Sequence, residues 1–150
     1  MKNILNDQNY SEIRNRIQIL TATNPQRWGK MKIEQMLVHC TRQLKLAVGE
    51  ISSDPQGASF LRTRLGKWIL FSSIPWPKGA ETPVEMNAKL ASVPLNDIEI
   101  EKSELLDYLE KAREQEQLMP HPFFGELNRK KWARLIYKHL DHHLRQFGSR

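Results

Sequence analysis

The sequence has a single cysteine, Cys40, among its 150 residues. A lone cysteine cannot form a disulfide within the chain, which excludes the disulfide-stapled class of small secreted proteins and favours a reducing compartment. The chain also lacks an apolar run of the roughly 18–20 residues that a membrane-spanning helix needs, and its first residues lack the apolar core of a signal peptide. We therefore expect a cytoplasmic protein with no membrane partner, in which Cys40 is a buried, unreactive thiol.

Several motifs of known catalytic chemistry are also missing. The sequence contains no glycine-rich phosphate loop, no G-x-S-x-G nucleophile elbow, no CxxC pair and no paired-carboxylate signature. No internal repeat, low-complexity tract or linker divides it, and its length fits one domain with a substantial core. We therefore expect residues 1–150 to form a single domain whose chemistry comes from other residue types.

The net charge of +6 is spread along the chain. Basic residues are scattered among acidic ones, and no arginine-rich run or basic stripe interleaved with aromatic residues occurs. We interpret this charge as an aid to solubility that could also attract anionic small molecules. Nucleic acid is not an expected partner.

Apolar residues recur at helical spacing in five segments, and no segment has a convincing strand pattern. Capping and helix-breaking residues set the expected ends. These residues are Ser11, Gly49, Ser103, Asn128 and Gly148. The expected helices are residues 10–20, 32–48, 59–71, 103–117 and 129–147. The predicted fold class is therefore all-α, a helical bundle.

A proline-rich segment separates the third and fourth expected helices. Residues 72–96 contain four prolines, and a residue that precedes proline favours an extended conformation. We expect a long crossover loop, and a loop of this length in a compact domain is commonly functional or mobile. Trp76 and Lys78 are therefore candidate pocket residues, with the alternative that Trp76 only pins the loop to the core.

The last expected helix carries two histidines in the middle of its apolar face. At about 100° per residue, Trp132, Ile136, His139, His143 and Phe147 fall within roughly 80° of one another. Histidines at i and i+4 are one turn apart, so both imidazoles can reach one metal ion. A leucine follows His139 where H-E-x-x-H metalloproteases have glutamate, which excludes that class.

Spacing alone leaves three interpretations of His139 and His143 open. They could be core histidines that are hydrogen-bonded to polar partners. They could bind a divalent cation together with a third ligand from another helix. Alternatively, one of them could move protons without a metal.

Two further histidines lie near this pair in the sequence. His142 is about 60° from His139 on the helical wheel, so it could support the ligands or lie at the rim of the site. His121 precedes the same helix and could return over the pocket as a proton donor or a substrate contact. The alternatives are an exposed side chain for His142 and an ordinary turn residue for His121.

His39 lies in the expected helix 32–48 but outside its apolar stripe. It is about 120° from the centre of that stripe and is aligned with Gln35 and Gln43 at i−4 and i+4. Periodicity therefore predicts a solvated polar ridge, with the alternative that the ridge faces a cavity of the bundle. Cys40 points about 100° away from His39, which argues against a Cys–His nucleophile pair.

Five motifs in a fixed order carry a family resemblance. They are Trp28-Gly-Lys-Met31, Gln35-Met-Leu-Val-His39, Pro75-Trp-Pro-Lys-Gly79, His121-Pro-Phe-Phe-Gly125 and Tyr137-Lys-His139-Leu-Asp-His-His143-Leu-Arg-Gln-Phe147. Together they resemble a branch of the DinB superfamily, classed as a domain of unknown function and similar to YfiT-like candidate metalloenzymes. The resemblance covers about residues 14–148. It implies a four-helix bundle with a down-up-up-down connection, to which this chain adds a helix and the proline-rich crossover loop.

The resemblance also implies a metal site. Such proteins typically use one histidine of the second helix and the HxxxH pair of the last helix. Carried over by position, these ligands are His39, His139 and His143, which reverses the interpretation of His39 from periodicity. Zinc or nickel would suit three imidazoles.

Characterised relatives in this superfamily include transferases and isomerases that use mycothiol, bacillithiol or glutathione, and YfiT-like members are described as hydrolases. The resemblance therefore implies a bacterial, metal-dependent enzyme that acts on a small molecule by thiol transfer or hydrolysis. A low-molecular-weight thiol is an expected cosubstrate, and a homodimer is compatible with the family. The alternative is a non-catalytic helical bundle that binds a small molecule or a partner.

Overall fold

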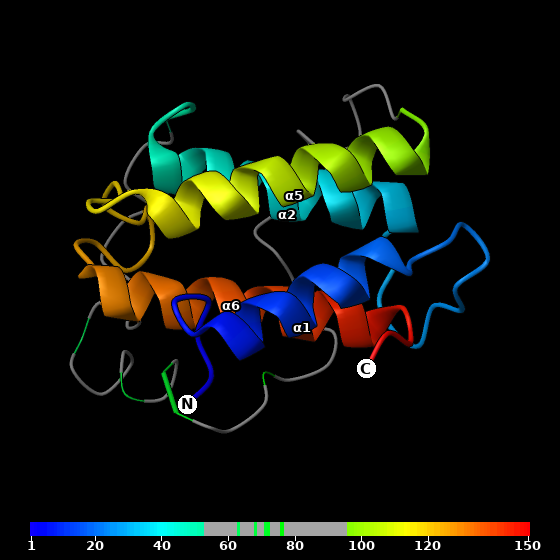
Figure 1. The fold of residues 1–150 in the computed structure, drawn as a ribbon, viewed down its shortest axis with the longest axis horizontal. Helices are drawn as coiled ribbons and strands as arrows, with labels where there is room; N and C mark the ends of the chain where they lie inside the picture. The colour runs from blue at the N-terminus through cyan, green and yellow to red at the C-terminus, as the bar shows by residue number, and fades with distance from the viewer. Residues whose placement is uncertain (53–62, 64–67, 69–70, 73–75, 77–95) are drawn as a thin grey trace.

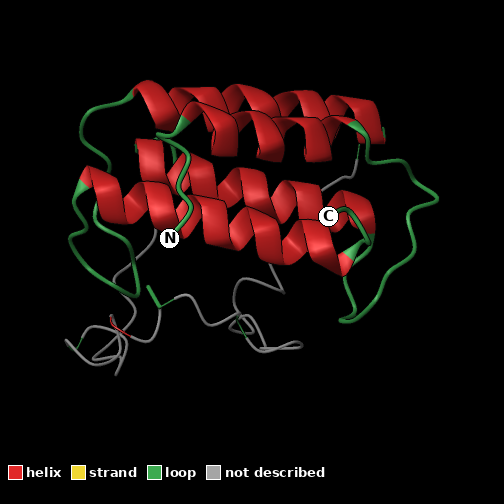
Figure 2. Cartoon of the chain, turned by 60° about the horizontal axis from the view of Figure 1, so that its bottom comes forward, coloured by secondary structure: helices red, strands yellow, loops and turns green. Residues whose placement is uncertain are grey.

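Four α-helices make up most of the chain that the computed structural model describes, which is residues 1–52, 63, 68, 71, 72, 76 and 96–150. The helices are α1 (Asp7–Gln18), α2 (Ile33–Val48), α5 (Ile98–Glu114) and α6 (Arg129–Gln146). In these residues the only β-type pairing is an isolated bridge between His121 and Gly125. The predicted all-α class is confirmed (Figure 2).

The helices pack as a bundle of two pairs (Figure 1). α1 lies beside α6 and α2 lies beside α5, while further contacts join α1 to α5 and α2 to α6. In Figure 1, α1 and α6 run from left to right, whereas α2 and α5 run from right to left. This is the expected down-up-up-down connection.

Apolar side chains from all four helices fill the centre of the bundle. The buried residues recur at helical spacing, as an amphipathic helix requires. They include Ile13 and Ile17 of α1, Leu37 and Leu44 of α2, Leu105 and Leu109 of α5, and Ile136 and Leu140 of α6. Cys40 is fully buried in this core, as expected, and burial raises the pKa of its thiol. None of the helices in the described part of the chain is long and apolar enough to cross a membrane.

The two helices that carry the histidines of interest have nearly the predicted bounds. α2 ends at Val48 because Gly49 adopts a left-handed conformation, with φ of +83°. At the start of α6, the Asn128 side chain accepts a hydrogen bond of 2.9 Å from the Lys131 N–H. The helix gives way at Phe147 to Gly148, which has φ of +74°.

The predicted starts of α1 and α5 are wrong by several residues. Asn6 caps α1 and Asp97 caps α5, each accepting a backbone N–H, so Ser11 and Ser103 lie inside their helices. α1 begins with the polar residues Asp7-Gln-Asn9, and α5 begins with Ile98-Glu-Ile-Glu101, in which apolar and polar residues alternate instead of recurring at helical spacing. The true caps therefore precede the apolar pattern from which the starts were predicted.

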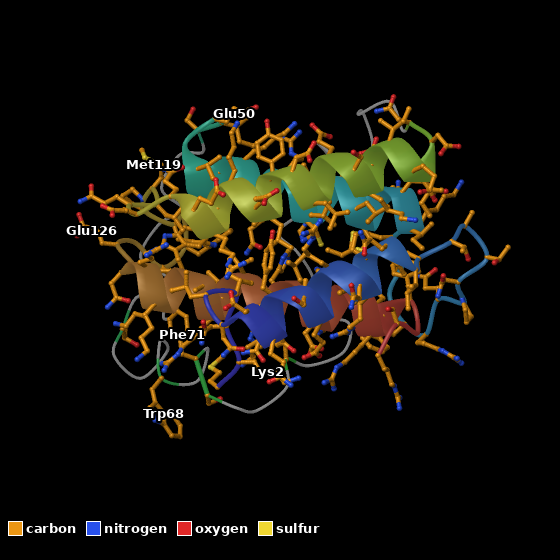
Figure 3. All side chains as sticks on the ribbon, in the orientation of Figure 1. Lys2, Glu50, Trp68, Phe71, Met119 and Glu126 are labelled. Carbon is orange, nitrogen blue, oxygen red and sulfur yellow. The ribbon has the colours of Figure 1, made fainter. Side chains whose placement is uncertain are left out.

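Most of the expected helix 59–71 and most of the expected loop 72–96 lie outside the described residues. Trp68, which falls on the apolar face predicted for helix 59–71 and was therefore expected to be buried, is 67% exposed and points away from the four helices (Figure 3). Helical spacing identifies residues that share a face, but it does not say which face meets the core. Trp76 is partly buried against the core.

The two candidate caps provide a test of helix capping. We expect Asn128→Ala to lower the free energy of unfolding by about 1 kcal/mol, because it leaves the Lys131 N–H without its acceptor. Ser103→Ala is the matched control. It should change stability by less than about 0.5 kcal/mol, since Ser103 is exposed within α5. Urea unfolding followed by circular dichroism measures both values, and equal losses would contradict the assigned caps.

Candidate metal centre

Three histidines from two helices meet inside the bundle. His39 comes from the middle of α2, and His139 and His143 come from successive turns of α6. Their exposed fractions are 5%, 7% and 7%. One ring nitrogen from each lies within 4.8 Å of the others. These three residues, the three-histidine group, are brought together by the i, i+4 spacing on α6 and by the packing of α2 against α6.

The three rings contact one another directly. Nε2 of His39 lies 2.9 Å from Nε2 of His139, so one of these atoms donates a hydrogen bond and the other accepts it. The ring centroids are 4.6 to 4.9 Å apart. Nδ1 of His39 and Nδ1 of His139 are buried without a hydrogen-bond partner in the described part of the chain. Among the described residues, His39 and His139 are therefore hydrogen-bonded only to each other, each through its Nε2.

His143 is held differently, by a side chain outside the group. Its Nδ1 lies 2.9 Å from Oε1 of Gln146, a residue that is 3% exposed. Nε2 of Gln146 in turn donates to the carbonyl of Trp28 over 2.8 Å. Gln146 is not among the residues that spacing and resemblance select. Its i+3 position after His143 on the same helix is the signal that could have identified it.

Burial keeps the three-histidine group neutral at pH 7. It lowers the pKa of His39 to about 4, with the charge of Arg42 acting in the same direction. It lowers the pKa of His143 to about 3, and it places the pKa of His139 well below 6.5, where the neighbouring histidines depress it further. A neutral imidazole offers the lone pair that a metal requires. The donor set, three buried neutral imidazoles, therefore fits a divalent transition metal.

The buried position of His39 contradicts the solvated ridge that periodicity predicts. Gln43, one turn further along α2, is also buried, and its Oε1 has no hydrogen-bond partner among the described residues. Gln35 is only partly buried, and its Oε1 accepts the Lys32 N–H over 2.8 Å at the start of the helix. Apolar periodicity detects contacts between apolar faces. It does not detect a polar ridge such as that of His39, which is buried against a polar partner, His139 of α6.

His142 lies beside the three-histidine group and close to two tryptophans. Its ring centroid is 5.2 Å from that of His143, 5.8 Å from that of Trp28 and 6.0 Å from that of Trp76. Trp76 also lies 6.1 Å from His139. Burial lowers the pKa of His142, although Asp141 opposes this shift. The pocket roles of His142 and Trp76 stay predictions, and Lys78 lies outside the described residues.

His121 is not part of the three-histidine group. Its ring stacks on Phe124 at 4.2 Å and packs against Trp132 at 5.3 Å. Its Nδ1 accepts the Phe123 N–H over 3.1 Å, and two backbone hydrogen bonds with Gly125 close the turn. These contacts match the alternative of a turn residue, and a role as proton donor stays a prediction.

The buried histidines lead us to expect that stability falls below pH 6.5, and His121 is a suitable probe. Burial lowers its pKa from 6.5 to about 4. Between pH 6.5 and about 4, the unfolded chain takes up a proton on His121, whereas the folded chain does not. The free energy of unfolding therefore falls as the pH falls, and this loss is absent above pH 6.5.

His121→Asn tests this linkage because asparagine can still accept the Phe123 N–H but does not titrate. We expect the variant to lose less stability than wild type, by up to about 1.4 kcal/mol for each pH unit between 6.5 and 4. Urea unfolding across this range, with a chelator present, measures the slope. Identical slopes in the two proteins would contradict the prediction.

A protein-family model matches almost the whole chain, over residues 2–150, and its description is "Protein of unknown function (DUF1569)". No curated protein and no solved structure matches the chain. Because the family model covers far more than half of the sequence, the chain belongs to the family of proteins of unknown function DUF1569.

Proposed function

We propose that this protein is a metal-dependent enzyme of the DinB and YfiT-like type, in which His39, His139 and His143 hold a divalent metal ion. The observation that carries the proposal is the convergence of three buried, neutral imidazoles within 4.8 Å. The ordered motifs that resemble the DinB superfamily support the same ligand set. The description of the family includes no activity, so the proposed reaction class depends on the site and on this resemblance.

Three protein ligands leave a coordination position free for water or substrate, as in catalytic zinc sites. When bound, a zinc or nickel ion would supply Lewis acidity, which polarises an electrophile or lowers the pKa of a water or thiol. The chain itself provides the remaining functions. Trp28 and Trp76 both contact His142, and we assign them as walls of the substrate pocket. Gln43 offers a buried amide oxygen, and we assign it as a hydrogen-bond acceptor for substrate.

The proposed substrate is a small molecule, and the proposed reaction is thiol transfer or hydrolysis. Cys40 is the only cysteine, and it is buried with a raised pKa, so it cannot serve as the reacting thiol. A transfer reaction would therefore use a low-molecular-weight thiol as cosubstrate. The net charge of +6 is compatible with an anionic compound of this kind. A homodimer is compatible with the proposal, which assigns no interface.

Elemental analysis of protein purified without a histidine tag tests the ligand set. We expect near-stoichiometric divalent metal in wild type, directly or after incubation with zinc or nickel. His39→Ala and His143→Ala should each lose it, because each removes one of three ligands. His142→Ala is the matched control and should keep its metal, since His142 neighbours His143 on α6 but lies outside the group.

Circular dichroism should show that each variant remains helical. A folded wild-type protein that takes up neither zinc nor nickel would overturn the metal proposal. The three histidines would then be core polar groups that bond to one another, as the contact between His39 and His139 allows.

Activity forms a separate test. Metal-loaded wild type should turn over at least one compound in a panel of thiol-transfer and hydrolase substrates, and we expect His143→Ala to reduce the rate by at least about a hundredfold. The same assays with enzyme whose metal has been removed by a chelator measure any metal-independent rate. If metal and ligands bind but no substrate turns over, the non-catalytic binding module becomes the better interpretation.

A further inference from the structure

We propose that Gln146 is a positioning residue, whose amide fixes the hydrogen of His143 on Nδ1 and so leaves Nε2 free to bind the metal. The inference rests on the proposed function for the metal itself. The hydrogen positions on which the inference is based are those of the metal-free protein.

The two contacts of Gln146 determine the orientation of its amide. A backbone carbonyl can only accept hydrogen bonds, so the Gln146 atom that lies 2.8 Å from the Trp28 oxygen is the amide nitrogen. The amide oxygen therefore faces Nδ1 of His143 over 2.9 Å. That oxygen can only accept, so Nδ1 carries the hydrogen. In a neutral imidazole the lone pair is then on Nε2, which is the atom available to a metal.

The other two histidines of the group have no such partner in the described part of the chain. Nδ1 of His39 and Nδ1 of His139 have no hydrogen bond among the described residues, and their Nε2 atoms face each other at 2.9 Å. Either ring of this pair could therefore be the donor. Among the three ligands, His143 is the one whose tautomer a residue outside the group selects before a metal binds.

The loop between α1 and α2 also holds Gln146 in place. The Arg27 N–H donates to the carbonyl of Gln146 over 2.7 Å, which ties the loop to the end of α6. Gly29 has φ of +83°, and a Cβ at this position would lie 2.4 Å from Nε2 of Gln146. Glycine therefore leaves the space through which the amide reaches the carbonyl of Trp28. One amide links a proposed ligand to the loop that carries a tryptophan of the site.

Zinc affinity provides the first test, measured by competition with a chromophoric chelator. We expect Gln146→Met, which has a similar length but no amide, to bind zinc about 10–100-fold more weakly than wild type. Gln146→Ala should show the same direction of change. Gln146→Glu should retain wild-type affinity or exceed it, because a carboxylate also accepts the hydrogen of Nδ1.

Gln26→Ala is the matched control. Nε2 of Gln26 donates to the same Trp28 carbonyl over 3.2 Å, but Gln26 is exposed and outside the three-histidine group. Its loss should change zinc affinity by less than about twofold. If Gln26→Ala weakened zinc binding as much as Gln146→Met does, the inference would be overturned, because anchoring of the loop would then explain both results.

The second readout is the tautomer of His143 in the metal-free protein, from the ¹⁵N chemical shifts of its ring. Wild type and Gln146→Glu should show hydrogen on Nδ1, whereas Gln146→Met should show a shift toward hydrogen on Nε2. Hydrogen on Nε2 in wild type would overturn the inference, as would equal zinc affinities of wild type and Gln146→Met. If wild type binds no zinc although its Nδ1 carries hydrogen, the proposed function fails instead, and the metal role of Gln146 fails with it.

Discussion

The packing of α2 against α6 is the contact on which the candidate site depends, because it buries three imidazoles away from water. Burial of a polar ring costs free energy unless the ring is hydrogen-bonded. The bond between His39 and His139 and the bond between His143 and Gln146 offset part of this cost. The same burial depresses the three pKa values, so the helix contact both assembles the donor atoms and keeps them unprotonated.

The sequence was most informative where strong local signals coincide. Asn128 and Gly49 mark the ends of α6 and α2, and the apolar face of α6 locates His139 and His143. Periodicity failed for His39, because its burial depends on a partner 100 residues away on another helix. Family resemblance supplied that pairing. Gln146 was missed although its i+3 spacing from His143 could have indicated their contact, whereas no side-chain pattern encodes its second partner, a backbone carbonyl of a distant loop.

The chain belongs to a family of unknown function, so the chemistry available at the three-histidine group has to be inferred from the residues themselves. Its donor atoms are all imidazole nitrogens, and its one thiol is sealed in the core. In the part of the chain that the structure describes, this group therefore includes neither a nucleophile nor a carboxylate ligand. Catalysis here would therefore work by binding and polarising an incoming group, and substrate identity would be decided by residues around the three-histidine group.

The pairing of α1 with α6 places the two ends of the described chain in one half of the bundle. Arg16 joins them through the Asp141 carboxylate at 2.7 Å and the Ser149 carbonyl at 2.9 Å, across more than 120 residues. Closing so long a loop has an entropic cost that contacts within one helix do not have. We therefore expect the α1–α6 pair to dock late in folding. During synthesis on the ribosome, the site would remain incomplete until α6, which carries His139 and His143, has emerged.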